Sequence, residues 1–115
     1  MPRRHRLPRT ARLLDRAQFK AVFDARRSRG NSYFRVHYAA SDAARLGIAV
    51  SRRVSKRAVD RNRIKRQVRE TFRLWRDKLE SLDYVVVARS AARDADRRVL
   101  KEQLEQLWQR FSDEP

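Results

Sequence analysis

Residues 56–79 carry an apolar side chain at every third or fourth position, which is the spacing that places such side chains on one face of an α-helix. A short segment that is apolar on both faces follows at 84–88, as expected of a strand buried inside a sheet. A long amphipathic helix followed by a buried strand restricts the chain to folds in which helices cover a sheet. The apolar stripe of the helix consists of Ile64, Val68, Phe72, Trp75 and Leu79.

Two shorter helices are predicted on either side of this unit. Asp15 is placed to cap a helix that ends near Arg27, because its side chain can accept a hydrogen bond from a first-turn amide. The last helix starts near Asp94 or Asp96 and ends near Phe111, and its apolar residues again recur at intervals of three and four. Each helix therefore has one face that can pack on a sheet.

Residues 32–40 and 46–51 alternate their side chains with the period of a β-strand. A turn at Gly30-Asn31 precedes them, and the connection between them is short, so they are predicted to be antiparallel neighbours. The intervening helix predicts that strands 46–51 and 84–88 run parallel. Such crossovers are right-handed in most proteins. The element order indicates a two-layer α/β (α+β) sandwich with helices on a small mixed sheet.

The length and composition set further limits. A chain of 115 residues with 41% hydrophobic residues supports one domain with one modest core. Residues 1–12 contain two prolines and no periodicity, so we expect a basic flexible arm there and a single domain over 13–115. No segment reaches the roughly 18 apolar residues of a membrane span. Cysteine is absent, which excludes disulfides and thiolate chemistry. We expect a soluble, cytoplasmic protein with no membrane partner.

The positive charge is concentrated in two blocks. The formal net charge is +16, with 30 Lys and Arg against 14 Asp and Glu. Residues 1–30 hold ten basic and two acidic side chains, and residues 51–76 hold eleven and two, whereas residues 77–115 hold seven and nine. A charge that served only solubility would be spread more evenly. The distribution therefore favours a surface that binds a polyanion such as RNA.

Most cations of the 56–79 helix share one broad face beside the apolar stripe. Solvated helical faces usually carry ion pairs at i,i+4 spacing. Here Arg61, Lys65, Arg69 and Arg73 follow one another at that spacing, and like charges so placed destabilise a helix. The pattern favours an external phosphate ligand over an ordinary solvated surface.

Three segments resemble those of a known family. Residues 56–66 (KRAVDRNRIKR) resemble the signature of the protein subunit of bacterial ribonuclease P, whose hallmark is Arg-Asn-Arg within a basic helix. Residues 46–53 resemble the preceding strand and its pair of cations, and residues 83–89 resemble the later buried strand. The similarity extends in the right order from about Leu13 to Phe111.

The resemblance implies a more detailed fold than the periodicity does. It implies the order helix-strand-strand-strand-helix-strand-helix and a four-stranded mixed sheet of ribosomal-protein-like topology. The additional strand is expected within residues 44–53. The resemblance also implies a left-handed βαβ crossover, against the general rule, and we adopt that expectation.

The resemblance further implies a function. The family joins a catalytic RNA and removes the 5′ leader from precursor tRNA by endonucleolytic cleavage. The RNA holds the catalytic Mg²⁺ and performs the hydrolysis, so ribonuclease P RNA and precursor tRNA are the expected partners, with no obligate protein partner. The residues agree: the two histidines, His5 and His37, have no convincing acid/base or metal-binding companion, and no catalytic or metal-ligating residue is expected in the protein.

Two sets of site residues follow from the resemblance. The set expected to bind the RNA subunit comprises Arg52, Arg53, Lys56, Arg57, Arg61, Asn62, Arg63, Lys65, Arg66, Arg69 and Arg73. The set expected to line a cleft for the single-stranded leader, between the first helix and the sheet, comprises Phe19, Phe23, Tyr33, Arg35 and His37. Aromatic stacking tolerates any base, which suits a leader of variable sequence.

Three alternatives remain open. Phe19 and Phe23 at helical spacing are also consistent with ordinary core, although Val22 and Leu14 can supply buried contacts instead; Trp75 and Trp108 are predicted to be core. The chain as a whole is also consistent with a ribosomal or general RNA-binding protein. An autonomous nuclease is disfavoured by the sparse catalytic side chains.

Overall fold

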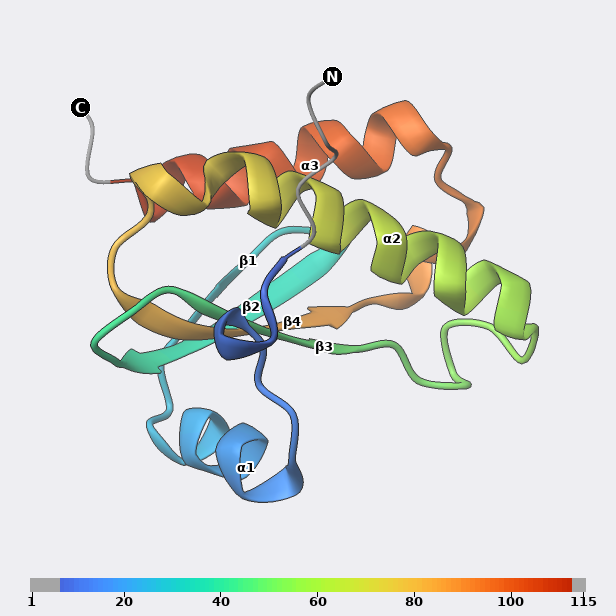
Figure 1. The fold of residues 1–115 in the computed structure, drawn as a ribbon. Coiled ribbons are helices and arrows are strands. Elements are labelled where there is room, and N and C mark those ends of the chain that lie inside the picture. The colour runs from blue at the N-terminus through green and yellow to red at the C-terminus, as the bar shows by residue number, and fades with distance from the viewer. Residues whose placement is uncertain (1–6, 113–115) are drawn as a thin grey trace.

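The computed structural model describes residues 7–112, which form a four-stranded sheet covered by helices (Figure 1). The α-helices are α1 (Arg16–Asp24), α2 (Ala58–Trp75) and α3 (Arg97–Arg110). The strands are β1 (Ser28–Gly30), β2 (Phe34–Ala40), β3 (Arg45–Ala49) and β4 (Leu82–Ala88). Short 3₁₀ turns are η1 (Arg9–Ala11), η2 (Arg76–Lys78) and η3 (Ser90–Asp94). The helices and strands predicted from side-chain periodicity are all present, with ends shifted by a few residues.

The strand order is β1-β2-β4-β3. β4 pairs antiparallel with β2 and parallel with β3, which confirms the predicted parallel pair. The prediction that 32–40 and 46–51 are neighbours is wrong: they are antiparallel, but β4 lies between them because it pairs along both. Two side-chain hydrogen bonds from Arg45 to Asp83, of 2.7 and 2.8 Å, fasten β3 to β4.

The fourth strand also differs in position from the prediction. It is β1, with Ser28 opposite His37 and Gly30 opposite Arg35, and not a second strand within residues 44–53. It begins just after the predicted end of the first helix near Arg27, and the helix itself stops earlier, at Asp24. Three residues without an apolar alternation become a strand here because β2 offers them backbone partners.

The connection from β3 through α2 to β4 is a left-handed crossover, as the family resemblance implied. In Figure 1, β3 and β4 run side by side in one direction and α2 returns above them. This handedness is rare among parallel strands. It places α2 above the parallel pair, beside α3, on one face of the sheet.

The main core lies between the sheet and the pair α2 and α3. Phe72, Tyr84 and Trp108 are fully buried, and the ring of Trp108 lies 5.4 Å from Phe72 and 5.5 Å from Tyr84, edge to face. The Trp108 indole donates a 3.0 Å hydrogen bond to the hydroxyl of Thr71, so its polar atom is satisfied inside the core. Trp108 is therefore core as predicted, whereas Trp75 is only half-buried at its edge.

α1 covers the opposite face of the sheet over a much smaller core (Figure 1). Leu13, Val22 and Val85 are buried there, and Phe19 is half-buried against them. The helix begins as predicted, with a reciprocal cap: the Asp15 carboxylate accepts from the Gln18 amide, and the Gln18 side chain accepts from the Asp15 amide.

The segment that leads into α1 belongs to the fold from Leu7 onward. Leu7 and Ala11 are buried, and the Leu13 amide donates to the carbonyl of Leu46 on β3. The predicted basic arm is therefore too long at its C-terminal end, and residues 1–6 of it lie outside the described part of the chain. Across residues 7–112, every helix is too short or too polar to traverse a lipid bilayer.

Candidate nucleic-acid interface

The apolar stripe of α2 faces the core and leaves a cationic face beside it. Ile64, Val68 and Phe72 are fully buried, which fixes the rotation of the helix. Arg66 and Arg69 are exposed as a consequence, and Lys65 is half-buried between the two faces. The sequence prediction of one broad cationic face is thus consistent with the observed burial.

Within the described residues, these cations are almost free of internal carboxylates. Arg73 pairs with Glu70 at 2.9 Å. Over residues 7–112 no carboxylate forms an ion pair with Lys65, Arg66 or Arg69. The face therefore keeps most of its charge available for an external anion.

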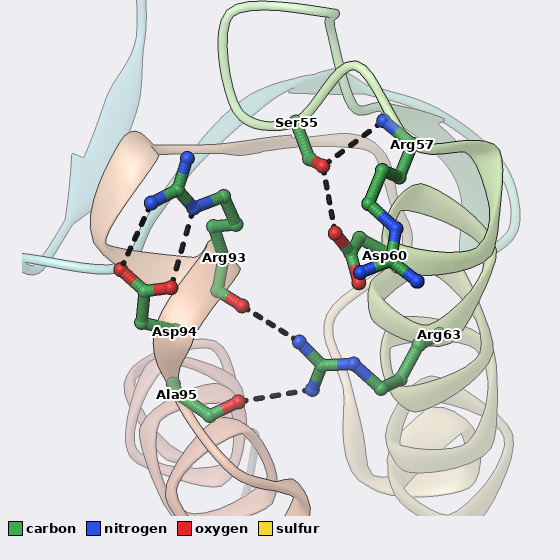
Figure 2. Close-up of polar contacts among 7 residues, drawn as sticks. All are labelled: Ser55, Arg57, Asp60, Arg63, Arg93, Asp94 and Ala95. Carbon is green, nitrogen blue, oxygen red and sulfur yellow. Dashed lines mark hydrogen bonds and ion pairs between the residues drawn. The ribbon is translucent and has the colours of Figure 1, made fainter.

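Arg61, the first arginine of the Arg-Asn-Arg signature, bonds to the loop that precedes α2. One guanidinium nitrogen donates to the carbonyls of Ser55 and Lys56, both at 2.9 Å. The Ser55 hydroxyl donates to the Asp60 carboxylate at 2.8 Å and accepts from the Arg57 amide at 3.1 Å (Figure 2). The loop is therefore held in place by α2 itself.

Arg63, the second arginine of the signature, reaches in another direction. Its guanidinium donates to the carbonyl of Arg93, in η3, at 2.8 Å and to that of Ala95, between η3 and α3, at 2.9 Å (Figure 2). Asn62, between the two arginines, is exposed. Both arginines bond to backbone carbonyls and to no carboxylate within residues 7–112, so their positive charge is not neutralised.

The two segments held by these arginines enclose a cavity of about 550 Å³, which we call the loop notch. Its lining is residues 52–57, Asp60, Arg93 and Asp94. Four residues of the set expected to bind RNA thus line one cavity, and all four are exposed: Arg52, Arg53, Lys56 and Arg57. Arg93 and Asp94 were not predicted. No motif marks them, because only the tertiary contact from Arg63 brings that segment to the notch.

The predicted leader cleft is partly assembled. Phe19 lies against Gly47 of β3, where an added Cβ would stand 2.7 Å from the ring carbon Cζ. Phe23 is 38% exposed, and its ring contacts that of His37 edge to face at 4.8 Å between centroids. Burial, and secondarily the charge of Arg35, lowers the pKa of His37, which favours the neutral form of this imidazole.

Two other predicted cleft residues behave differently. Arg35 donates from its guanidinium to the hydroxyl of Ser28 at 3.0 Å and so lies along β1. Tyr33 precedes β2 and packs partly against the main core, contrary to its predicted place beside His37. Of the alternative core residues, Val22 is buried but Leu14 is 53% exposed. The Phe23 ring therefore contacts His37, whereas Tyr33 packs against the main core.

A second cavity joins the two predicted sites. It has a volume of about 200 Å³ and lies where the 7–14 segment, α1, β3 and α2 meet. Phe19 and Gly47 line it together with Lys65 and Arg69 of α2. An aromatic ring and two cations that share one cavity are suited to a nucleotide, which offers a base to stack and a phosphate to pair.

No group in residues 7–112 is suited to hold a metal ion. Three or more His, Cys, Asp or Glu side chains do not come together there, and His5 lies outside this part of the chain.

Comparison with known sequences gives one consistent family. A sequence model of the family described as Ribonuclease P matches residues 7–112. A ribonuclease P protein component from Thioalkalivibrio sulfidiphilus is 43% identical over 107 residues, which cover 91% of this chain and 89% of that protein. Another from Xanthomonas euvesicatoria is 43% identical over 106 residues, which cover 91% of this chain and 73% of the relative.

Solved structures agree with the sequence comparison. The RNase P protein of Staphylococcus aureus matches with a TM-score of 0.81 and 31% identity, over 86% of this chain and 93% of that one. The RNase P protein of Thermotoga maritima matches with a TM-score of 0.75 and 31% identity, over 95% of this chain and 99% of that one. The family model, the relatives and the solved structures together show that the chain belongs to the ribonuclease P protein family.

Proposed function

We propose that this chain is the protein subunit of a ribonuclease P and assists removal of the 5′ leader from precursor tRNA. The observation that carries the proposal is the cationic face of α2, where Arg66 and Arg69 are exposed and form no ion pair within residues 7–112. Family membership supports the same reading, because the relatives are named ribonuclease P protein components.

The RNA subunit binds along α2 and its preceding loop. The exposed cations there reach phosphates directly, and a planar guanidinium suits the two-pronged contacts that phosphates accept. Such contacts position the protein on the RNA and carry little sequence information. The direct contacts are assigned to Arg52, Arg53, Lys56, Arg57, Asn62, Lys65, Arg66 and Arg69.

The leader binds on the side of α1. Phe23 with His37, and Phe19 at the cavity it shares with Lys65 and Arg69, offer aromatic surface beside cations. A neutral His37 adds stacking surface without charge. Bases of any identity stack there, so the protein increases affinity for leader-bearing substrate without selecting a sequence.

Hydrolysis of the phosphodiester bond is assigned to the RNA, together with the Mg²⁺ ions that assist it. The described residues offer no group of metal ligands, and the cationic face attracts phosphate and not metal cations. The protein contributes by placing the substrate and by reducing repulsion between the RNA and the leader.

Reconstitution tests the proposal. This chain is mixed with a bacterial ribonuclease P RNA, and cleavage of a 5′-leader tRNA precursor is followed across Mg²⁺ concentrations. We expect the chain to restore cleavage at low Mg²⁺, where RNA alone is slow. No gain over RNA alone would reject the proposal, as would cleavage by the purified protein without RNA.

Single substitutions test the surface. Arg66→Ala and Arg69→Ala are each expected to weaken binding to the RNA and to lower the slope of log affinity against log salt by about one. Arg110→Ala, which removes an exposed charge at the far end of α3, is the matched control and is expected to leave the slope unchanged. An unchanged slope for both α2 variants would mean that these side chains contact no phosphate.

A further inference from the structure

The two signature arginines differ from the other cations of α2 in what they contact. Each guanidinium donates to two backbone carbonyls: Arg61 to Ser55 and Lys56, and Arg63 to Arg93 and Ala95. Both are half-buried, whereas Arg66 and Arg69 are exposed. A guanidinium presents its donors in a fixed fork, so two such bonds fix both the side chain and the segment that it holds.

The segments held in this way are the two walls of the loop notch. Arg61 holds the 52–57 wall, which Ser55 also ties to Asp60. Arg63 holds the wall that carries Arg93 (Figure 2). The walls, residues 52–57 and 93–94, lie about 40 residues apart in the sequence, and both arginines that join them to α2 belong to a three-residue motif.

The charge of the notch favours an anion. Five cations line it, namely Arg52, Arg53, Lys56, Arg57 and Arg93, against the two carboxylates of Asp60 and Asp94. Asp60 accepts from Ser55 and is thus engaged in the wall. Arg93 and Asp94 pair through exposed side chains at 3.2 Å, a contact that water screens strongly.

We propose that the loop notch is a phosphate-binding site for the RNA backbone, in which Arg93 is a direct contact and Arg63 a positioning residue that places it. The proposal rests on the proposed function, since it names a further contact within that RNA interface. A phosphate bound there displaces Asp94 from Arg93 and bridges the two walls. Arg63, which does not itself line the notch, acts through the backbone carbonyls of Arg93 and Ala95.

Arg93→Ala and Arg63→Ala, alone and together, test this assignment by RNA affinity across salt concentrations. The probe is a bacterial ribonuclease P RNA, and Arg110→Ala is again the matched loss of one charge. Arg93→Ala is expected to lower the salt slope by about one. Arg63→Ala is expected to do the same, and the double variant to bind like Arg63→Ala alone. A double variant that loses about two slope units, the sum of two independent contacts, would overturn the positioning role.

Arg63→Lys separates placement from charge. Lysine keeps the positive charge but lacks the planar fork that spans the Arg93 and Ala95 carbonyls. If Arg63 positions Arg93, the lysine variant binds RNA as weakly as Arg63→Ala, and amide exchange in residues 93–96 of the free protein rises. Wild-type affinity and slope in Arg63→Lys would show that only the charge matters and would overturn the assignment.

Asp94→Asn tests the direct contact of Arg93 through a change that is expected to strengthen RNA binding. Removal of this carboxylate frees Arg93 without altering the wall, so RNA affinity is expected to rise. If Asp94→Asn binds RNA no more tightly than the wild type, and Arg93→Ala leaves the salt slope unchanged, the loop notch is not part of the RNA interface. The proposed function would survive that outcome, because wild-type binding and leader cleavage are measured in the same series; loss of those would reject the function itself.

Discussion

On the face of the sheet covered by α2 and α3, Phe72, Tyr84 and Trp108 are fully buried, whereas on the face covered by α1 the Phe23 ring is 38% exposed. Within residues 7–112, the first face holds most of the buried core residues, and the cluster on the second face consists of Leu13, Val22 and Val85. This difference separates two tasks. Packing on the α2–α3 side stabilises the fold, and the thinner packing under α1 leaves aromatic surface that a ligand can reach.

The largest expected effect is a loss of stability when an aromatic ring is removed from the face covered by α2 and α3. Trp108→Ala is expected to lower the free energy of unfolding by about 3–5 kcal/mol, because a cavity replaces a fully buried side chain and Thr71 loses its indole donor. Urea denaturation measures the change, with Trp108→Phe as the milder variant. A loss no greater than that of Phe23→Ala would contradict the difference between the two faces.

Phe23→Ala is expected to show the opposite balance. Its stability loss should be about 1 kcal/mol or less, because the ring is already partly in water. The preference for leader-bearing over mature tRNA should fall by about 1–3 kcal/mol, the value of one stacked base. Leu74→Ala, which shortens an exposed apolar side chain of α2 away from this face, is the control. Normal discrimination together with early melting would show that Phe23 is core.

Gly47→Ala tests how tightly α1 packs on the sheet, at the point where Phe19 contacts β3. The added methyl would stand 2.7 Å from Cζ of Phe19, so the ring must move. We expect a loss of about 1 kcal/mol of stability from this overpacking. The loss should shrink when Phe19→Leu is introduced as well, because the shorter side chain removes the clash. An equal loss in both backgrounds would locate the strain elsewhere.

The smallest effect concerns the pH dependence of stability at His37. Its pKa is lower in the folded protein than in the unfolded chain, so the unfolded chain takes up the proton first as the pH falls. The stability that neutral His37 contributes is therefore full above the ordinary value of 6.5 and declines as the pH falls through the folded pKa. His37→Gln is expected to flatten this part of the profile of melting temperature against pH. A profile of unchanged steepness would contradict the assignment.

The sequence predicted elements whose signal is local. The stripe of α2 and the all-apolar β4 follow from side-chain period, and the Asp15 and Asp96 caps mark two helix starts. The three-residue β1 was missed because its identity as a strand comes from its partner β2. The insertion of β4 between β2 and β3 depends on pairing across some 40 residues, which periodicity does not record.

The same distinction applies to the site. The cations of the signature were predicted individually, since residue type and family resemblance point to them. The hydrogen bonds of Arg61 and Arg63 to backbone carbonyls could not be predicted. Every residue has a carbonyl, and no side-chain pattern marks the ones that accept these bonds. Arg93 was missed for the same reason. The handedness of the β3–α2–β4 crossover came from resemblance alone.

The pairing of the 11–13 segment with β3 has a consequence for self-association. β3 is an edge strand, and open strand edges invite a second chain to add on and polymerise. The Leu13 amide and the bridge between Arg12 and Leu46 occupy part of that edge, while the opposite edge is a strand of only three residues. Both edges of the sheet therefore offer little free backbone to a second chain, one because it is partly paired and the other because it is short.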